Sequence, residues 1–167
     1  MDIATFIIEA LKFIAPAYAA NATPVLAGGG TPMDFGRNFL DGKRIFGTNK
    51  TFRGFFFGWA IGILVGTVEG FVFGFAYYGV AFSLLTPLGA LLGDLTGAFI
   101  KRRLNIKPGG LLPVVDQVDF VVGALVFALP LMAVSWELAV TVLLLTPPIH
   151  LFTNFVAYKL KLKKHPW

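Results

Sequence analysis

The chain alternates long apolar runs with two polar, basic connections. A helix needs ~20 mostly apolar residues to cross a bilayer. Runs that approach or reach this length cover residues 3–26, 54–77, 80–100, 118–135 and 138–158. The pattern therefore predicts an all-α integral membrane protein with five transmembrane helices, in a single membrane domain over residues 1–167.

The connections between these runs differ in length. Very short turns near Tyr78–Gly79 and Ser135–Trp136 join the second run to the third and the fourth to the fifth as hairpins. The two long connections cover residues 27–53 and 101–117. Five spans place both of these connections and the C-terminal tail on the same side of the membrane.

Positive charge gathers on that side. Thirteen of the 14 Lys and Arg residues lie in the two long connections and the tail: Arg37, Lys43, Arg44, Lys50, Arg53, Lys101, Arg102, Arg103, Lys107, Lys159, Lys161, Lys163 and Lys164. Cytoplasmic loops of membrane proteins are enriched in Lys and Arg. We therefore expect a multi-pass protein of the cell membrane with its N-terminus outside and its C-terminus in the cytoplasm.

Composition supports the membrane interpretation and excludes several kinds of site. The chain is 56% hydrophobic, with a mean hydropathy of +0.76. It has no Cys and only two His, which excludes disulfides and thiolate sites and argues against a His-based zinc site. Glu9 and Lys12 lie in the first apolar run, which lacks the basic flank of a signal peptide, so we interpret it as mature protein. The basic excess suits membrane lipids or a phosphate-rich substrate, and the hydropathy argues against nucleic acid.

Three acids stand out in the apolar part of the chain. In the stretch VVDQVDF, residues 114–120, Asp116 and Asp119 are three positions apart and leave the same face of a helix. Asp94 precedes Lys101 by seven residues, which places it roughly 10 Å into the membrane on nearly the same helix face. We expect these acids to meet the loop cations at one site on the cytoplasmic side.

This combination favours phosphate and metal chemistry. Carboxylates suit Mg²⁺, whose other ligands are often water and substrate phosphates. Lys and Arg neutralise phosphate oxygens, and the glycine-rich segment GKRIFGTNKTFRG, residues 42–54, has the composition of a binding loop. Two simpler alternatives remain: the cations hold the anionic leaflet, and the acids cap a helix. For the tail lysines of residues 159–164 we prefer the leaflet interpretation.

The same residues resemble a known family. The segment GDLTGAFIKRRLNIKPGGLLPVVDQVDF, residues 93–120, together with GKRIFGTNKTFRG, is similar to the archaeal CDP-archaeol synthases, and the resemblance covers nearly the whole chain. That family is related to the phosphatidate cytidylyltransferases. The signature elements kept here are Lys101-Arg102, Lys107, Pro113, Asp116 and Asp119.

Other parts of the cytidylyltransferase signature are changed. Ala98 stands at the signature Ser, Pro108 follows Lys107 in place of Asp, and Gln117 replaces the Arg between the two acids. The His-Gly-Gly element is missing. These departures fit the archaeal branch better than the bacterial one, and no role for the missing Ser or His is carried over.

The resemblance implies that CTP reacts with 2,3-bis-O-geranylgeranylglyceryl phosphate to give a CDP-lipid and pyrophosphate, with Mg²⁺ as cofactor. It implies Asp94, Asp116 and Asp119 as metal ligands, directly or through water, and Lys101 as a further catalytic residue. The residues expected to bind CTP and the lipid phosphate are Lys43, Arg44, Asn49, Lys50, Lys101 and Arg102.

Three further features allow structural interpretations. Glycine recurs every four residues from Gly54 to Gly74, which favours close helix packing within the chain or, alternatively, a homodimer seam. Lys12 and Glu69 fall at a similar depth and are predicted to form a buried ion pair, with Glu9 as a competing partner. A polar stripe on the last helix either packs inward or lines the active-site cavity; its members are Thr146, His150 and Asn154.

Two rival functions fit the sequence less well than the synthase. A CDP-alcohol phosphotransferase needs an Asp-Gly-x-x-Ala-Arg run followed by further acids; Asp41-Gly42 begins such a run, but the rest does not follow. A small membrane transporter or binding protein for an anionic or nucleotide ligand would carry its charges near the midplane, often in inverted repeats. The charges here lie at one interface, so the pattern favours an enzyme.

Overall fold

The computed structural model describes residues 2–74, 79–163 and 165–166. Their regular structure is entirely helical. The helices are α1 (Ile3–Ala22), α2 (Pro24–Ala27), α3 (Phe52–Phe73), α4 (Val80–Arg103), α5 (Val115–Ala128) and α6 (Trp136–Lys159). Isolated bridges join Pro32 to Thr51 and Asn38 to Arg44 in the loop between α2 and α3. The all-α prediction is confirmed for the described residues.

Four helical segments are long and apolar enough to cross a membrane. They are Ile3–Ala27, Phe52–Phe73, Val80–Arg103 and Trp136–Lys159. They match four of the five predicted spans to within a few residues, except that positions 75–77 of the second span, and Tyr78 of the first predicted turn, lie outside the described residues. Four apolar spans are therefore shown by length and composition.

The predicted helix over residues 118–135 is wrong at both ends. Helix α5 begins at Val115 and ends at Ala128, so its 14 residues extend about 21 Å at 1.5 Å per residue. Pro130 lacks a backbone N–H and cannot continue the helical hydrogen bonds. The chain instead turns, with the N–H groups of Leu131 and Met132 both donating to the carbonyl of Ala128, at 2.9 and 3.2 Å.

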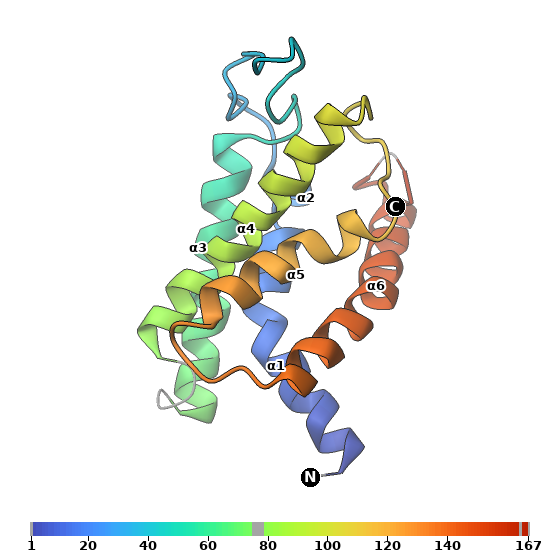
Figure 1. The fold of residues 1–167 in the computed structure, drawn as a ribbon. Coiled ribbons are helices and arrows are strands. Elements are labelled where there is room, and N and C mark those ends of the chain that lie inside the picture. Colours follow the sequence, from blue (N-terminus) through green and yellow to red (C-terminus); the bar gives the residue numbers. More distant parts are fainter. Residues whose placement is uncertain (1, 75–78, 164, 167) are drawn as a thin grey trace.

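The two ends of the bundle differ in character (Figure 1). The loop before α3 and the connection after α4 lie at the end drawn uppermost, whereas the N-terminus and the segment between α5 and α6 lie at the opposite end. The apolar core between them joins α1, α4, α5 and α6. Its largest fully buried hydrophobic side chains are Phe13, Ile14, Phe120, Val121 and Val142.

The glycine ridge of α3 packs within the chain. Gly54, Gly58, Gly62, Gly66 and Gly70 are all buried. A methyl group on Gly62 would lie 2.5 Å from Cβ of Pro87 in α4, and one on Gly58 would lie 2.6 Å from the carbonyl oxygen of Ala20 in α1. The ridge thus faces α1 and α4, so the structure supports packing within the chain rather than a seam facing outward.

A second glycine seam joins α4 to α5. A methyl group on Gly89 would collide with the carbonyl oxygen of Gly123, and one on Gly93 with the carbonyl oxygen of Asp119. Small residues at this spacing let two helix backbones approach closely. This seam sets how near Asp94 and Asp119 lie, because each is adjacent to, or in contact with, a seam glycine.

The predicted ion pair between Lys12 and Glu69 is not formed. Lys12 Nζ donates instead to Glu9 Oε1 at 2.8 Å, the competing partner on its own helix, and lies 4.3 Å from the centre of the Phe73 ring. Glu69 Oε2 is buried and has no hydrogen-bond partner among the described residues. Glu9 is three positions from Lys12 on the same helix, so this pair forms whatever the relative rotation of α1 and α3, whereas a pair with Glu69 requires both helices to face each other at these residues.

Candidate functional site

The loop over residues 28–51 is built around one buried carboxylate. The side chain of Asp34 is fully buried and accepts hydrogen bonds from the backbone N–H groups of Gly36, Phe46 and Gly47 at 2.9–3.1 Å. Arg44 adds two more, from Nε at 3.0 Å and from Nη2. Burial alone would raise the pKa of Asp34, but the hydrogen bonds from Arg44 and the backbone outweigh it and hold that pKa well below its usual range.

A reciprocal contact ties this loop to the end of α4. Lys43 Nζ donates to the carbonyl of Arg103 at 2.7 Å, and Arg103 Nη2 donates to the carbonyls of Lys43 and Arg44 at 3.2 and 2.6 Å. Arg103 Nε lies 2.8 Å from a carboxylate oxygen of Asp41. Lys43 and Arg44, both expected to bind phosphate, therefore use their side-chain donors inside the chain.

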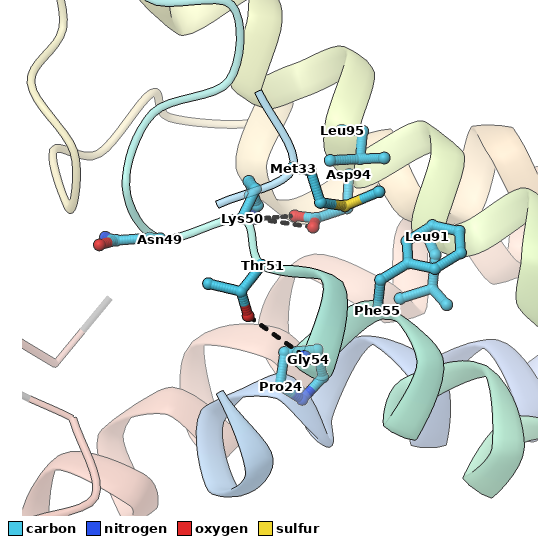
Figure 2. A pocket seen from close by; sticks show the side chains of 10 residues that line it. All are labelled: Pro24, Met33, Asn49, Lys50, Thr51, Gly54, Phe55, Leu91, Asp94 and Leu95. Carbon is cyan, nitrogen blue, oxygen red and sulfur yellow. Dashed lines mark hydrogen bonds and ion pairs between the residues drawn. The ribbon is translucent and has the colours of Figure 1, made fainter. Parts of the chain in front are cut away.

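Lys50 crosses from the loop to α4. Its Nζ lies 2.7 and 2.6 Å from the two carboxylate oxygens of Asp94 (Figure 2). Both side chains line a small pocket whose other walls are mostly apolar, and Asn49 is exposed at its edge. The lining residues are Pro24, Met33, Asn49, Lys50, Thr51, Gly54, Phe55, Leu91, Asp94 and Leu95. The predicted pairing of loop cations with Asp94 is thus present through Lys50.

A second lysine joins α4 to the start of α5. Lys101 Nζ donates to Asp116 Oδ2 at 2.7 Å, and the backbone N–H of Leu112 donates to the same oxygen at 2.9 Å. The two side chains are 15% and 17% exposed, so the pair is partly shielded from water. This contact aligns the first turn of α5 with the last turns of α4.

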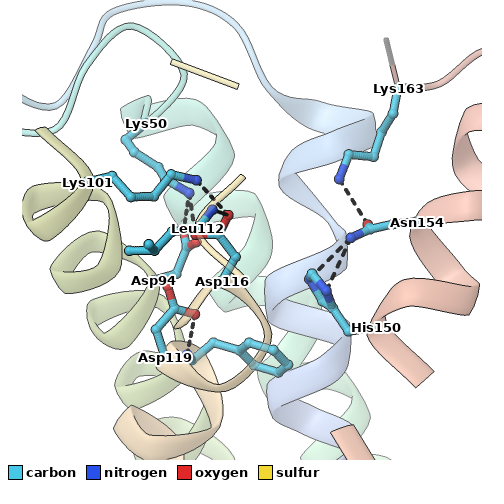
Figure 3. Close-up of polar contacts among 10 residues, drawn as sticks. Lys50, Asp94, Lys101, Leu112, Asp116, Asp119, His150, Asn154 and Lys163 are labelled. Carbon is cyan, nitrogen blue, oxygen red and sulfur yellow. Dashed lines mark hydrogen bonds and ion pairs between the residues drawn. The ribbon is translucent and has the colours of Figure 1, made fainter. Parts of the chain in front are cut away.

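Asp119 lies one turn further along α5 and differs from the other two acids. Its Oδ1 accepts a hydrogen bond from the backbone N–H of Phe120 at 2.6 Å, and its Oδ2 lies where a methyl group on Gly97 would stand. No Lys, Arg or His among the described residues forms an ion pair with it. The negative charges of Asp94 and Asp116 act on this carboxylate, and the positive charge of Lys50 acts on it in the opposite sense. Figure 3 shows the three acids gathered between α4 and α5 with Lys50 and Lys101 beside them.

Arg102 is buried beneath the loop. It is 8% exposed, and its Nε has no hydrogen-bond partner in the described part of the chain. A methyl group on Gly47 would lie 3.5 Å from Nη1 of Arg102, which is ordinary van der Waals contact, so the guanidinium lies against the backbone of the loop at Gly47. A buried donor without a partner is costly, and this one adjoins the lysine and acid cluster.

The acids fit a magnesium ion only together with further ligands. In the described residues, no three His, Cys, Asp or Glu side chains are arranged to hold a metal ion by themselves. Asp94 and Asp116 each form an ion pair with a lysine, whereas Asp119 forms none in the described part of the chain and lies beside the other two acids. Mg²⁺ commonly takes one or two protein carboxylates plus water and phosphate oxygens, so the donor set suits a metal that arrives with a polyphosphate.

Three residues of this region were missed or assigned otherwise from the sequence. Asp34 had a readable signal, because its hydrogen bond to the N–H two residues on is an Asx turn of the kind that Asp-x-Gly favours. Arg103 packs its guanidinium over the Phe39 and Phe99 rings, at 5.2 and 4.4 Å from their centres. Lys163, assigned to the membrane surface, donates instead to buried Asn154 at 2.9 Å.

The polar stripe of α6 faces the interior. Thr146 is fully buried and shares a hydrogen bond of 2.9 Å with the hydroxyl of Tyr18 in α1. Asn154 Nδ2 lies 3.2 and 3.3 Å from the two ring nitrogens of His150. The His150 ring lies 6.0 Å from the ring of Phe120, the residue after Asp119. Thr146 therefore packs within the bundle, whereas His150 lies close to the part of α5 that carries the acids.

Comparison with known proteins places the chain in one family. The family model described as CarS-like, CDP-archaeol synthase, matches residues 3–167. The CDP-archaeol synthase of Pyrococcus furiosus is 48% identical, over 96% of this chain and 98% of that protein. The CDP-archaeol synthase of Methanococcus maripaludis strain S2 is 44% identical over the full length of both chains.

A solved structure gives the same result for the fold. It is that of an intramembrane enzyme for archaeal membrane lipids biosynthesis, and it superimposes with a TM-score of 0.83 at 40% sequence identity, covering 89% of this chain and 94% of the other. The acids and basic loops described above lie inside the segment that the family model matches. The chain belongs to the CDP-archaeol synthase family.

Proposed function

We propose that this chain is a CTP-dependent nucleotidyltransferase that transfers CMP to 2,3-bis-O-(geranylgeranyl)-sn-glycerol 1-phosphate, giving CDP-unsaturated archaeol and pyrophosphate. Family membership supports the reaction class and substrates. The observation that carries the proposal within the chain is the cluster of Asp94, Asp116 and Asp119 with Lys50 and Lys101 at the junction of α4 and α5.

The reaction needs positioning and charge neutralisation more than covalent catalysis. An oxygen of the lipid phosphate attacks the α-phosphorus of CTP, the bond from that phosphorus to the oxygen bridging to the β-phosphate breaks, and pyrophosphate leaves. A phosphate monoester is already a nucleophile near neutral pH, so no Ser or Cys intermediate is required. A bound Mg²⁺ would offset negative charge on the departing pyrophosphate.

The residues take distinct parts in this proposal. Asp94, Asp116 and Asp119 would hold the Mg²⁺, directly or through water. Lys50, Lys101 and Arg102, whose Nε has no hydrogen-bond partner among the described residues, neutralise phosphate oxygens, and exposed Asn49 contacts the nucleotide. Lys43 and Arg44 act by holding the loop in place, because their donors are used within the chain.

We further propose that the chain crosses the membrane five times, with the site on the cytoplasmic side. Helix α5 and the segment over residues 129–135 would together form the short fifth pass. Irregular backbone at membrane depth is tolerated where protein covers it, and Leu131, Met132 and Val134 pack on the core. The excess of Lys and Arg at the end that carries the acids supports the orientation.

Because the chain has no Cys, single cysteines test this orientation directly. Leu40 is 95% exposed in the basic loop, and Ala133 is exposed in the segment between α5 and α6. A membrane-impermeant maleimide is expected to label Ala133→Cys in intact cells and Leu40→Cys only after permeabilisation. The reverse pattern would invert the proposed topology.

The reaction is tested with purified protein in detergent, Mg²⁺, labelled CTP and the geranylgeranyl ether lipid phosphate. Labelled CDP-lipid and pyrophosphate are expected from wild type, and neither from Asp116→Asn or from wild type in chelator. If no nucleotide and no lipid phosphate gave product, the enzyme proposal would fail. Tight CTP binding without product would then favour a binding protein or a transporter.

A further inference from the structure

A third lysine lies near the acid cluster, from the side of α6. Lys163 Nζ donates to Asn154 Oδ1 at 2.9 Å, and Asn154 is only 8% exposed (Figure 3). His150 contacts the amide nitrogen of Asn154 from one turn earlier in the helix. Lys163 is thus held by a small buried hydrogen-bonded group rather than extending into the surroundings as a tail residue.

A turn at the end of α6 brings Lys163 to this position. If the helix continued, Lys163 would lie nine residues beyond Asn154, about 13.5 Å further along the axis. Instead Lys161 takes a left-handed conformation with φ of 59°, and the N–H of Leu162 donates to the carbonyl of Ala157 at 2.9 Å. This is the usual form of a left-handed helix end, and it reverses the chain so that Lys163 returns alongside the helix.

The charges around Lys163 are those of the proposed active site. Burial lowers the pKa of Lys163 below that of an ordinary lysine, and Lys50 and Lys101 lower it further, while Asp116 and Asp94 act in the opposite sense. No ion pair to Lys163 is formed among the described residues, and its printed hydrogen bond is to a neutral amide. A partly buried ammonium group close to two others is expensive unless an anion offsets it.

We infer that Lys163 is a phosphate-binding residue of the active site and that Asn154 positions it. Lys163, Lys50 and Lys101 would then surround a substrate phosphate from three different parts of the chain. The inference rests on the proposed function and adds a residue to it. The ligand chemistry is a phosphate group, which either CTP or the lipid phosphate supplies. The His150 ring lies 6.0 Å from the Phe120 ring and tilted against it, which brings this part of α6 next to the neighbour of Asp119 in α5.

Three tail variants test the inference. Lys163→Met removes the ammonium and keeps the length of the side chain, and Lys163→Arg keeps the positive charge. Lys159→Met is the matched control, because Lys159 is exposed in the last turn of α6 and precedes the left-handed turn. Steady-state KM and kcat are measured for both substrates. CTP and the lipid phosphate are also titrated separately by calorimetry in detergent with Mg²⁺, together with thermal unfolding.

Loss of one charge-assisted contact to phosphate is expected to raise KM and Kd for one substrate about tenfold or more. We expect this for Lys163→Met, with most of the affinity restored by Lys163→Arg and a change of less than about twofold in Lys159→Met. The substrate whose titration weakens identifies whether the nucleotide or the lipid supplies the phosphate.

Two results would overturn the inference. Unchanged KM and Kd for both substrates in Lys163→Met would exclude a binding role. A lower unfolding temperature with kcat reduced, KM unchanged and no rescue by Lys163→Arg would make Lys163 a structural tether of the tail. Wild type that formed no CDP-lipid would instead remove the proposed function, and the two titrations would still decide whether Lys163 binds phosphate.

Discussion

Asp34 in the basic loop and the acids of α4 and α5 lie at the same end of the molecule, but their hydrogen bonds and ion pairs differ. Asp34 is fully buried and receives five hydrogen bonds, two of them from the fork of Arg44. Asp94 is paired with a single lysine, and Asp119 has no cationic partner among the described residues. An arginine fork fixes a carboxylate in one geometry, whereas a lysine is a flexible point charge. Asp34 therefore holds the loop, and in our proposal the acids of α4 and α5 remain available for substrate.

Removing the charge of Asp119 should give the largest effect of any substitution considered. Asp119→Asn is expected to lower kcat/KM for CDP-lipid formation about 10³-fold, about 4 kcal/mol of transition-state stabilisation. Its unfolding temperature in detergent should stay the same or rise, because a carboxylate near Asp94 and Asp116 is removed. A loss of stability as large as that of Asp34→Asn would show that Asp119 stabilises the fold as Asp34 does, and would contradict the difference between the two acids.

Removing the charge of Asp34 should show the opposite pattern. Asp34→Asn leaves Arg44 without its counter-ion, and breaking a buried pair in this way is expected to cost about 3 kcal/mol in the free energy of unfolding. The specific activity of the folded fraction at low temperature should remain near that of wild type. Thermal unfolding and activity on the same sample check both parts, and Glu137→Gln, at an exposed position in the first turn of α6, serves as the control.

Two glycine substitutions separate packing from chemistry. Gly97→Ala places a methyl group against Asp119 Oδ2, whereas Gly66→Ala places one 2.9 Å from Cα of Ser83, far from the acids. Both should reduce the free energy of unfolding by about 1–2 kcal/mol. Activity is expected to fall at least tenfold in Gly97→Ala, because a displaced carboxylate costs catalysis steeply, at about 10²-fold for 1 Å. Equal activity in the two variants would contradict the placement of Asp119 in the site.

Lys50→Met tests whether Lys50 leaves Asp94 to bind substrate phosphate. Lys50 and Asp94 are 28% and 25% exposed, so their pair should contribute less than about 1 kcal/mol to stability. We expect an almost unchanged unfolding temperature but a raised KM for CTP, since Lys50 is proposed to move to phosphate oxygens. A change in kcat alone, with KM for CTP unaltered, would argue against that role.

The smallest expected effect is that of pH near neutrality. The pKa of Asp34 is lower in the folded chain than its unfolded value of ~3.9. Its contribution to stability is therefore complete above that unfolded value and is lost as pH falls through the folded pKa. Its share of the unfolding temperature should be constant from pH 8 to pH 5. Below pH 4, the unfolding temperature of wild type should approach that of Asp34→Asn.

Much of the fold was predictable because apolar length is a strong signal. Four spans followed from runs of apolar residues, with boundary errors of a few residues. The end of α5 did not follow, because residues 129–135 are as apolar as a helix and only Pro130 marks the break. The ion pair of Lys12 also went to the wrong acid, since sequence gives depth in the membrane but not rotation about the helix axis.

The candidate site was predictable in its acids but less so in its cations. Asp94, Asp116 and Asp119 lie together as expected from their spacing (Figure 3). Lys43 and Arg44 were predicted to bind phosphate because they lie in a glycine-rich loop. Arg44 instead binds Asp34, ten residues earlier, and Lys43 binds the backbone carbonyl of Arg103, a kind of partner that no sequence pattern indicates. Lys163 was hidden for another reason: a left-handed turn at a lysine has no sequence signal comparable to glycine.

The glycine seam between α4 and α5 has a consequence for large-scale mutagenesis. At Gly89, Gly93, Gly97 and Gly123, any replacement adds atoms where a neighbouring backbone or carboxylate already lies. In a saturation scan scored by growth, these four positions should tolerate substitution as poorly as the acids, although none of them contacts substrate in our proposal. Adding a count of folded protein in the membrane for each variant would distinguish the seam from the residues that perform the reaction.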